Sequence, residues 1–358
     1  MNLDARGRRA TQAAFGSVTR VDPVAGLAEL LRRRRRRHVT RAVTALATAF
    51  ALAIVAWVGV RESERVTSVV NPPPGSLGRV AATIPVGAGP VDVLVNQDAV
   101  WVANAAQGTV SRIDPTTNTV TQTIRVGRNP IRLVAGFGSI WVANQTEQTI
   151  SRIDARTGQP VATISLPTLG PNQLAVGAGS VWAIAGYLLR RIDPATNKAV
   201  AVDADWELVD GGLTVASGRV WLSGAAYSGA QPIVRVDPAT NRKADTVPTQ
   251  ADSALAAGAG SVWHAGITTQ TIYRLDAKSG RTLAEIPIGV VAKYMTAAEG
   301  SLWVGSDSGR VTRIDMASNK IVGTFQVGGR APGVAVGLES VWIVDTAHAA
   351  LLRVQPAP

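Results

Sequence analysis

The sequence contains no cysteine, and this absence excludes several classes of protein. A disulfide scaffold, a thiolate-bound zinc or iron–sulfur centre and a cysteine nucleophile all require thiols. Charged residues are also scarce, at 17%, whereas hydrophobic residues make up 46%. A chain of 358 residues with this balance buries a sizeable core, so we expect a globular or membrane-associated protein and not a disordered one.

Common catalytic motifs are absent as well. No Gly-x-Ser-x-Gly, His-Glu-x-x-His or phosphate-binding loop occurs in the chain. Histidine, the usual general acid or base near neutral pH, occurs only three times, at His38, His264 and His348. Any enzymatic activity must therefore rest on few residues.

The excess of positive charge is confined to the N-terminus. The chain has a formal net charge of +11, of which residues 1–41 supply +8 through 11 arginines against three acidic residues. Residues 79–358 hold 23 basic and 20 acidic residues. Because this large remainder is nearly neutral, the sequence disfavours a body that binds nucleic acid, and we expect no nucleic-acid partner.

Residues 42–60 form an uncharged run of nineteen residues, AVTALATAFALAIVAWVGV. As a helix this run would extend for about 28 Å, which matches the hydrocarbon core of a bilayer. Residues 32–37 are six consecutive arginines, whereas the other flank carries two arginines and two glutamates. The positive-inside rule therefore predicts a single-pass membrane protein with a basic cytoplasmic tail over residues 1–41 and an extracytoplasmic remainder after residue 60.

A cleavable signal peptide is the alternative interpretation. The 41-residue leader and the nineteen-residue apolar segment are longer than such peptides usually have, and AWVGVRES offers no small-residue cleavage site. An uncleaved transmembrane helix is therefore favoured, with the arginine run as a signal for orientation rather than a nucleic-acid tail. Residues 61–78 follow as a linker, which Pro72, Pro73 and Pro74 stiffen.

Seven tryptophans recur at intervals of 39 to 42 residues beyond the linker. They are Trp101, Trp141, Trp182, Trp221, Trp263, Trp303 and Trp342. About eleven residues after most of them comes an Arg-Ile-Asp signature, as in Arg112-Ile113-Asp114. A turn such as residues 114–118 (DPTTN) then closes a hairpin, because Asp caps the turn, Pro presets φ and Asn takes the left-handed position.

Each unit of about forty residues accommodates four short strands and shows no helical periodicity. In the first unit we predict strands at about 91–95, 99–103, 109–114 and 119–126. Seven such units indicate an all-β fold, a seven-bladed β-propeller over residues 79–358. The last unit ends after three strands, whereas residues 79–87 (RVAATIPVG) match a fourth, so we predict that this N-terminal strand completes the last blade.

The repeat resembles that of the YVTN-type propellers. The matching residues read Trp101-Val102-Ala103-Asn104, Ile113-Asp114, Thr117-Asn118 and Thr123-Ile124-Arg125-Val126-Gly127, with tryptophan in place of the family's tyrosine. The repeat is also similar to the virginiamycin B (streptogramin) lyase-like propellers, and the resemblance covers residues 79–358. It implies the propeller fold but little about function, because propellers host many activities.

The two faces of such a ring differ in sequence. We call top the face that carries the loops from the second strand to the third and from the fourth strand to the next blade, and bottom the opposite face. The bottom turns are uniform and the top segments vary, so we expect the top to bind ligands. The candidate ligand-binding residues on it are Arg128, Arg132, Asn144, Tyr227, Lys293, Tyr294, Arg330 and Asp345.

Two segments depart from the repeat. The stretch from Trp221 to Arg235 is about three residues longer than its equivalents, which enlarges a top loop of blade four. Asp203, Asp205 and Glu207 alternate along one strand as a candidate cation site, although a solvated acidic edge is the favoured interpretation. We interpret the repeated tryptophans as packing between blades. We interpret the repeated arginines as structural contacts that join one blade to the next or to a turn, and we call each such contact a rung.

The lyase resemblance implies an acid, a base and a magnesium ion on the top face. The candidates are His264, His348 and Glu147, which do not match the lyase motif residue by residue, and a structural role is the simpler interpretation of each histidine. We therefore predict a membrane-anchored module that binds a polypeptide, glycan or small molecule at the cell envelope without a cofactor. The alternatives are a lyase-like enzyme, which alone calls for magnesium, and a sensor that signals through residues 1–41.

Overall fold

The computed structural model describes residues 75, 77–166, 169–204, 211–226, 229–230, 232–249, 254–327 and 333–356, and the backbone of residues 67–68. The predicted cytoplasmic tail (1–41), the predicted transmembrane helix (42–60) and most of the predicted linker (61–78) lie outside the described residues. Within the described part of the chain, no helix has the length and apolar character needed to cross a membrane.

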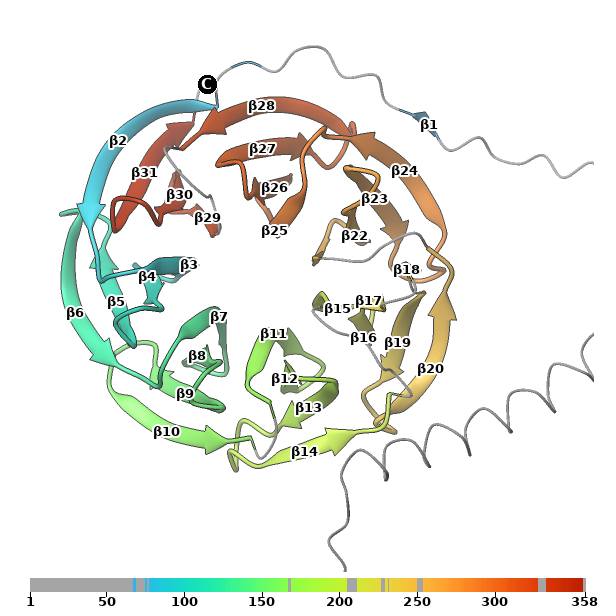
Figure 1. The fold of residues 1–358 in the computed structure, drawn as a ribbon, viewed down its shortest axis with the longest axis horizontal. Helices are drawn as coiled ribbons and strands as arrows, with labels where there is room; N and C mark the ends of the chain where they lie inside the picture. The colour runs from blue at the N-terminus through green and yellow to red at the C-terminus, as the bar shows by residue number, and fades with distance from the viewer. Residues whose placement is uncertain are drawn as a thin grey trace, which may run out of the picture. The chain divides into compact units, whose positions relative to one another are not determined.

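The described strands form a seven-bladed β-propeller (Figure 1). Each blade is a four-stranded antiparallel sheet, and its first strand lies at the centre of the ring. Blades one to three contain β3 (Pro90–Asn96), β4 (Ala99–Asn104), β5 (Thr109–Asp114), β6 (Thr119–Arg125); β7 (Pro130–Gly136), β8 (Ser139–Asn144), β9 (Thr149–Asp154), β10 (Pro160–Ser165); and β11 (Pro171–Gly177), β12 (Ser180–Ala185), β13 (Leu188–Ile192), β14 (Ala199–Val202).

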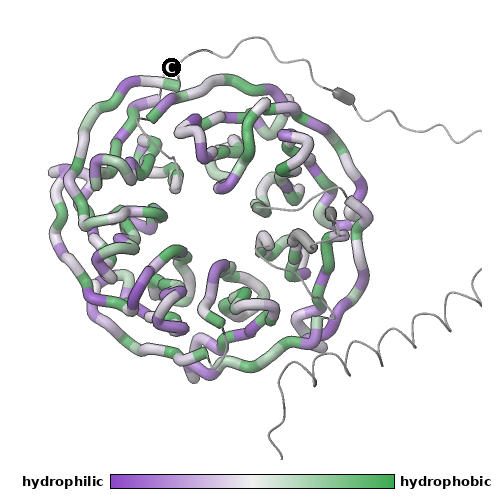
Figure 2. Tube along the Cα trace, in the orientation of Figure 1, coloured by the Kyte–Doolittle hydropathy of each residue, from purple (hydrophilic) through white to green (hydrophobic). Residues whose placement is uncertain are grey.

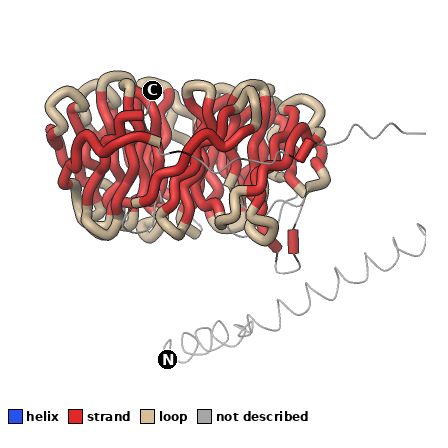
Figure 3. Tube along the Cα trace, turned by 90° about the horizontal axis from the view of Figure 1, so that it is seen from above, coloured by secondary structure: helices blue, strands red, loops and turns tan. Residues whose placement is uncertain are grey.

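Blades four to seven repeat this arrangement. They contain β15 (Leu213–Ala216), β16 (Arg219–Leu222), β19 (Ile233–Asp237), β20 (Arg242–Val247); β21 (Leu255–Gly258), β22 (Ser261–Gly266), β23 (Thr271–Asp276), β24 (Thr282–Pro287); β25 (Ala292–Ala298), β26 (Ser301–Ser306), β27 (Arg310–Asp315), β28 (Lys320–Gln326); and β29 (Val334–Gly337), β30 (Ser340–Asp345), β31 (Ala350–Pro356), β2 (Gly78–Pro85). Each innermost strand contacts that of the next blade, and β29 contacts β3, so the ring is closed. Seen from the side, the strands run between two rims of loops, the top and bottom faces (Figure 3).

The N-terminal strand completes the seventh blade, as the sequence predicts. Strand β2 pairs antiparallel with β31, from Gly78 opposite Pro356 to Pro85 opposite Ala350. Ile84 is 2% exposed and packs with Trp342 in the core beside blade one. The other residues of β2 are partly or largely exposed, and hydrophilic and hydrophobic residues alternate along such outer strands (Figure 2). This pattern fits a strand that covers a sheet edge with one face towards solvent.

Blade two shows how the repeated tryptophan and arginine hold the ring together. Trp141 is fully buried, and the guanidinium of Arg152 lies over its ring, 4.8 Å from the centroid. Nε of Arg152 donates to Oγ of Ser139 at 2.8 Å. Nη1 donates to the carbonyl oxygen of Pro194 and to Oδ1 of Asn197 in the next blade, at 2.6 and 2.9 Å. The arginine is therefore a rung between blades, which also satisfies the bottom turn of its neighbour.

The same rung joins the last blade to the first. Arg353 donates from Nη1 to the carbonyl oxygen of Pro115 at 2.6 Å and to Asn118 at 3.1 Å. In blade one the serine of the rung is replaced by Ala99, and the buried Nε of Arg112 has no hydrogen-bond partner among the described residues. The rungs thus repeat around the ring with local defects where the sequence departs from its consensus.

Two features lie outside the blades. Residues 225–226 and 229–230 pair as a small hairpin, β17 (Ala225–Ala226) and β18 (Gly229–Ala230), which is the enlarged loop expected in blade four. Before β2, strand β1 (Thr67–Ser68) pairs parallel with β24, and Leu77 donates its backbone N–H to the carbonyl oxygen of Thr324 on β28. The described linker residues therefore follow the outer strands of blades five and six.

Candidate functional site

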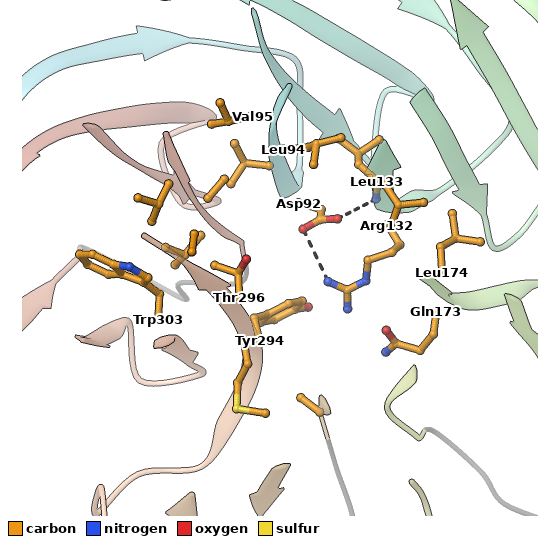
Figure 4. Close-up of a pocket in the computed structure, with 18 of the residues that line it drawn as sticks. Asp92, Leu94, Val95, Arg132, Leu133, Gln173, Leu174, Tyr294, Thr296 and Trp303 are labelled. Atoms are coloured by element: carbon orange, nitrogen blue, oxygen red, sulfur yellow. Dashed lines mark hydrogen bonds and ion pairs between the residues drawn. The ribbon is translucent and has the colours of Figure 1, made fainter. Parts of the chain in front are cut away.

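The innermost strands of all seven blades enclose a cavity of about 390 Å³ in the central channel (Figure 4). Seven apolar side chains, one from each blade, contribute to its lining. They are Val93, Leu133, Leu174, Leu213, Leu255, Met295 and Val334. The lining combines these apolar side chains with polar groups, and the polar members decide what the cavity can bind.

The polar members occupy one equivalent position of the repeat. The residue before each of the seven apolar side chains is Asp92, Arg132, Gln173, Gly212, Ala254, Tyr294 or Gly333. In blades one, two, three and six the strand pairing shifts by one residue directly before this position. A β-bulge of this kind re-aims the side chain that follows it. The four large polar residues therefore come from bulged strands, whereas Gly212, Ala254 and Gly333 occupy the same position in the other three blades.

Asp92 is the buried carboxylate of the cavity. It is 6% exposed, and Oδ2 accepts the backbone N–H of Leu133 at 2.7 Å. Oδ1 lies 3.6 Å from Nη1 of Arg132 (Figure 4). Burial raises the pKa of Asp92, whereas the charge of Arg132 and the backbone N–H groups of Leu133 and Val93 lower it. Asp92 is thus held by a specific set of donors at the channel wall.

Arg132 reaches across the channel. Its guanidinium carbon lies 5.1 Å from the ring centroid of Tyr294, which belongs to blade six, four blades away along the chain (Figure 4). Its Nε is buried and has no hydrogen-bond partner among the described residues. A cation that is stacked on one face and paired at one nitrogen still presents donors along its edge. This edge is suited to a planar anionic group such as a carboxylate.

Two other predicted binding residues lie at or near the top face as ion pairs. Nζ of Lys293, which lines the cavity, is 3.9 Å from Oδ2 of Asp307. Nε of Arg128 donates to Oε2 of Glu147 at 2.7 Å, and this hydrogen bond and charge lower the pKa of Glu147. The structure thus groups Arg132, Lys293 and Tyr294 around the cavity, while Arg128 and Glu147 satisfy each other.

Asn144 and Asp345 have structural roles at the ends of equivalent strands. Asn144 is fully buried, and Nδ2 donates to Oγ1 of Thr149 and Oγ of Ser151, at 3.0 and 2.9 Å. Asp345 is 5% exposed and accepts from Nδ1 of His348 at 2.7 Å. Both side chains therefore fix the loop that follows their strand and do not present themselves to a ligand on the top face.

His264 lies inside the wall between blades and not at the channel mouth. It is fully buried, stacks on Tyr273 with centroids 4.7 Å apart, and contacts Oγ1 of Thr249 through Nε2 at 2.8 Å. Burial lowers its pKa to about 3, so the ring is neutral at physiological pH. His264, His348 and Glu147 belong to three different blades, and each has its own partner, so they form no acid–base pair.

Several predicted site residues lie outside the described residues. These are Tyr227, Arg330, Asp205 and Glu207. The backbone of Asp203 forms a bridge with Arg242 of the next blade. Within the described ranges, no group of three or more histidine or acidic side chains is placed to hold a metal ion.

Comparisons with known proteins support the fold. No protein-family model matches the sequence, and no curated protein sequence matches it. Among solved structures, hydrazine synthase of Kuenenia stuttgartiensis aligns with a TM-score of 0.64 at 14% identity, covering 75% of this chain and 96% of that chain. The computationally designed protein Ika8 aligns with a TM-score of 0.60 at 12% identity, covering 76% and 98%. At such low identity the likeness shows a shared β-propeller fold and nothing about activity.

Sequence reasoning missed Asp92 and Gln173, which also line the cavity. Both are polar residues one place before an apolar residue that recurs in every unit. Aligning the seven units on that apolar residue places them in the same column as Arg132 and Tyr294. The sequence therefore contains the pattern that identifies these two residues, but a search confined to the loops of the top face does not find it.

Proposed function

We propose that this chain is a membrane-anchored, extracytoplasmic binding module that takes a carboxylate group into the cavity of its propeller. The observation that carries the proposal is the cluster of Asp92, Arg132 and Tyr294, in which a largely buried arginine spans the channel and its Nε has no hydrogen-bond partner among the described residues. The carboxylate belongs to a small molecule or to the end of a polypeptide or glycan at the cell envelope. We also propose that the repeats are of the YVTN type, on the repeated residues alone.

The charge of the cavity favours an anion. Its charged lining residues are Asp92, Arg132 and Lys293, and Lys293 is paired with Asp307 outside the lining. The anion is therefore expected at Arg132, which contacts Asp92 through Nη1 alone. Ala254, which lines the cavity in blade five, contributes little side-chain volume. A ligand carboxylate can therefore approach the free edge of Arg132 without displacing Asp92, and the rest of the ligand contacts the apolar wall.

Binding of small carboxylates tests this proposal. Titration calorimetry of the purified chain with succinate, citrate and glutamate should reveal binding by at least one of them. Arg132→Gln should weaken that binding by about tenfold or more, because a charge-assisted hydrogen bond is lost. Arg132→Lys keeps a cation beside Asp92 but lacks the planar fork, and it should also bind more weakly.

Arg156→Gln is the matched control, since Arg156 is an exposed arginine in the bottom turn of the same blade. This variant should bind as tightly as the unchanged chain. Heat evolved by none of the three carboxylates, or equal affinity in the Arg132 and Arg156 variants, contradicts the cavity as the site.

Membrane orientation is tested separately. Because the uncharged run 42–60 follows the arginines, protease added to intact cells or spheroplasts should digest the chain beyond about residue 78 and spare residues 1–41. Antibodies against each end, applied to blots of the treated cells, give the readout. A propeller that is protected until the cells are lysed excludes this orientation, and a mature N-terminus near residue 61 excludes the anchor.

A further inference from the structure

A second cavity opens on the top face between blades two and three. It has a volume of about 340 Å³ and is separate from the central channel. Three loop segments and the start of one strand form it. The lining residues are Gln145, Thr146, Gln148, Leu169, Gly170, Asn172, Gly186 and Tyr187. We call it the blade 2–3 groove.

The groove exists because two loops depart from the repeat. The connection between β12 and β13 has two residues, Gly186 and Tyr187, whereas the equivalent loops in blades one and two have four. The connection between β10 and β11 has five residues, whereas the connections that lead into blades one and two, from β2 to β3 and from β6 to β7, have four each. A shortened loop lowers the rim of blade three, and the longer one brings Leu169 against Gly186.

Glycines allow these loops to approach closely. A Cβ atom on Gly170 would lie 1.7 Å from the carbonyl oxygen of Gln145, so any other residue would push the two loops apart. Gly186 has a φ of 61°, in the left-handed region that favours glycine. The groove is thus built by specific residues and is not a gap left between loops.

The floor of the groove is an exposed aromatic and aliphatic surface. Tyr187 is 51% exposed and Leu169 is 56% exposed, and Leu188 beside them is 40% exposed. Apolar side chains that are exposed together and rimmed by polar residues mark an interaction site. An aromatic ring that is flat, apolar and edged by a hydroxyl provides a stacking surface for a ligand that is itself partly apolar and partly polar.

The polar part of the lining consists of uncharged groups. Gln145, Gln148 and Asn172 contribute amides, and Thr146 contributes a hydroxyl. Nδ2 of Asn129 donates to Oε1 of Gln145 at 3.0 Å, which orients that amide. Amides combine donors with acceptors, so they match ligand hydroxyls, which also do both. None of the described residues that line the groove is a lysine, arginine, aspartate or glutamate, so these residues offer no counter-charge to an ionic ligand.

We propose that the blade 2–3 groove binds an uncharged sugar residue, which stacks on Tyr187 and hydrogen-bonds to the surrounding amides. A pyranose has apolar C–H faces and a rim of hydroxyls, and one or two such rings fit the volume of the groove. An extended peptide fits less well, because β12 and β13 pair on both sides within their sheet and leave no edge for strand addition. The site is independent of the proposed carboxylate site in the channel.

Saturation-transfer difference NMR with maltotriose and triacetylchitotriose, two uncharged oligosaccharides, tests the proposal on the purified full chain. At least one should receive saturation from the protein. Tyr187→Ala should raise its dissociation constant by about tenfold or more, the usual cost of losing a central aromatic contact. Tyr187→Phe retains the ring and should stay within about threefold. Gln148→Ala, in a different loop, should also weaken binding and provides a second test if Tyr187→Ala does not fold.

Phe137→Ala is the control, because Phe137 is an aromatic of similar exposure (44%) in a bottom turn of blade two. It should leave sugar binding unchanged, and so should Arg132→Gln, which separates this site from the channel. The proposal is overturned if neither oligosaccharide receives saturation, or if Tyr187→Ala and Gln148→Ala bind as well as the unchanged chain.

Discussion

Replacing Ile84 with aspartate should open the ring at its closing strand. Ile84 is 2% exposed and packs against Trp342, Val344 and Leu351, so an aspartate there loses the apolar contact and buries a carboxylate without a partner. We expect a loss of about 3–5 kcal/mol in the free energy of unfolding. For a domain of this size that corresponds to a fall of about 10 °C in the melting temperature. Thermal unfolding followed by circular dichroism gives the value.

Val80→Asp is the matched control in the same strand. Val80 is 43% exposed, so the same substitution at this position should change the free energy of unfolding by no more than about 0.5 kcal/mol. We also expect Ile84→Asp, and not Val80→Asp, to aggregate on heating, because it exposes the edge of β31. Equal melting temperatures for the two variants would mean that β2 does not hold the ring closed.

The ring itself was predictable because its determinants repeat. The spacing of the tryptophans and the Arg-Ile-Asp signature reflect one physical unit, in which Trp141 is buried and Arg152 ties the blade to the next. The strands expected for the first unit agree with β3 to β6 within a few residues. The missing fourth strand of the last unit was equally informative, since an unpaired edge requires a partner and β2 provides it.

The candidate site was less predictable because it depends on geometry that no single repeat contains. A two-residue alternation does not place Asp92 in the channel, since the bulge between Pro90 and Asp92 shifts the strand by one residue. The stacking of Arg132 on Tyr294 joins blades two and six, which only ring closure brings together. Asn144 was predicted to lie on the top face because it stands next to a loop. Its amide instead donates hydrogen bonds to Thr149 and Ser151 on the adjacent strand.

His264 should make the propeller lose stability as the pH falls below 6.5, above the range in which the capping carboxylates titrate. In the six other blades the equivalent position is apolar; the residues are Val102, Val142, Ala183, Leu222, Val304 and Ile343. Burial lowers the pKa of His264 from 6.5 to about 3, because the charged imidazolium would lose its hydration. In the unfolded chain this imidazole therefore binds a proton below pH 6.5, whereas in the folded chain it stays neutral down to about pH 3. The stability that this histidine contributes in neutral form is thus lost as the pH falls.

The capping carboxylates act at lower pH. Backbone N–H groups lower the pKa of Asp154 and Asp276 below 3.8, so their contribution is complete above that value and is lost only below it. Asp92 acts in the opposite direction, because burial raises its pKa and the folded chain then holds a proton that the unfolded chain has released. The histidine itself contributes a slope of about 1.4 kcal/mol for each pH unit below pH 6.5, and a total near 3 kcal/mol by pH 4.5. Denaturant titrations at several pH values measure this slope.

His264→Leu introduces the residue that blade four has at this position, and it should flatten the profile between pH 6.5 and 4.5. The loss of the contact with Thr249 costs about 1 kcal/mol at every pH, so the variant should be less stable at pH 7 and relatively more stable at pH 4.5. His348→Gln, which removes an exposed imidazole, serves as the control and should retain the steep profile. If the His264→Leu profile stays as steep as that of the unchanged chain, the buried imidazole is not the acid-sensitive group, and the source of the slope must lie among the carboxylates.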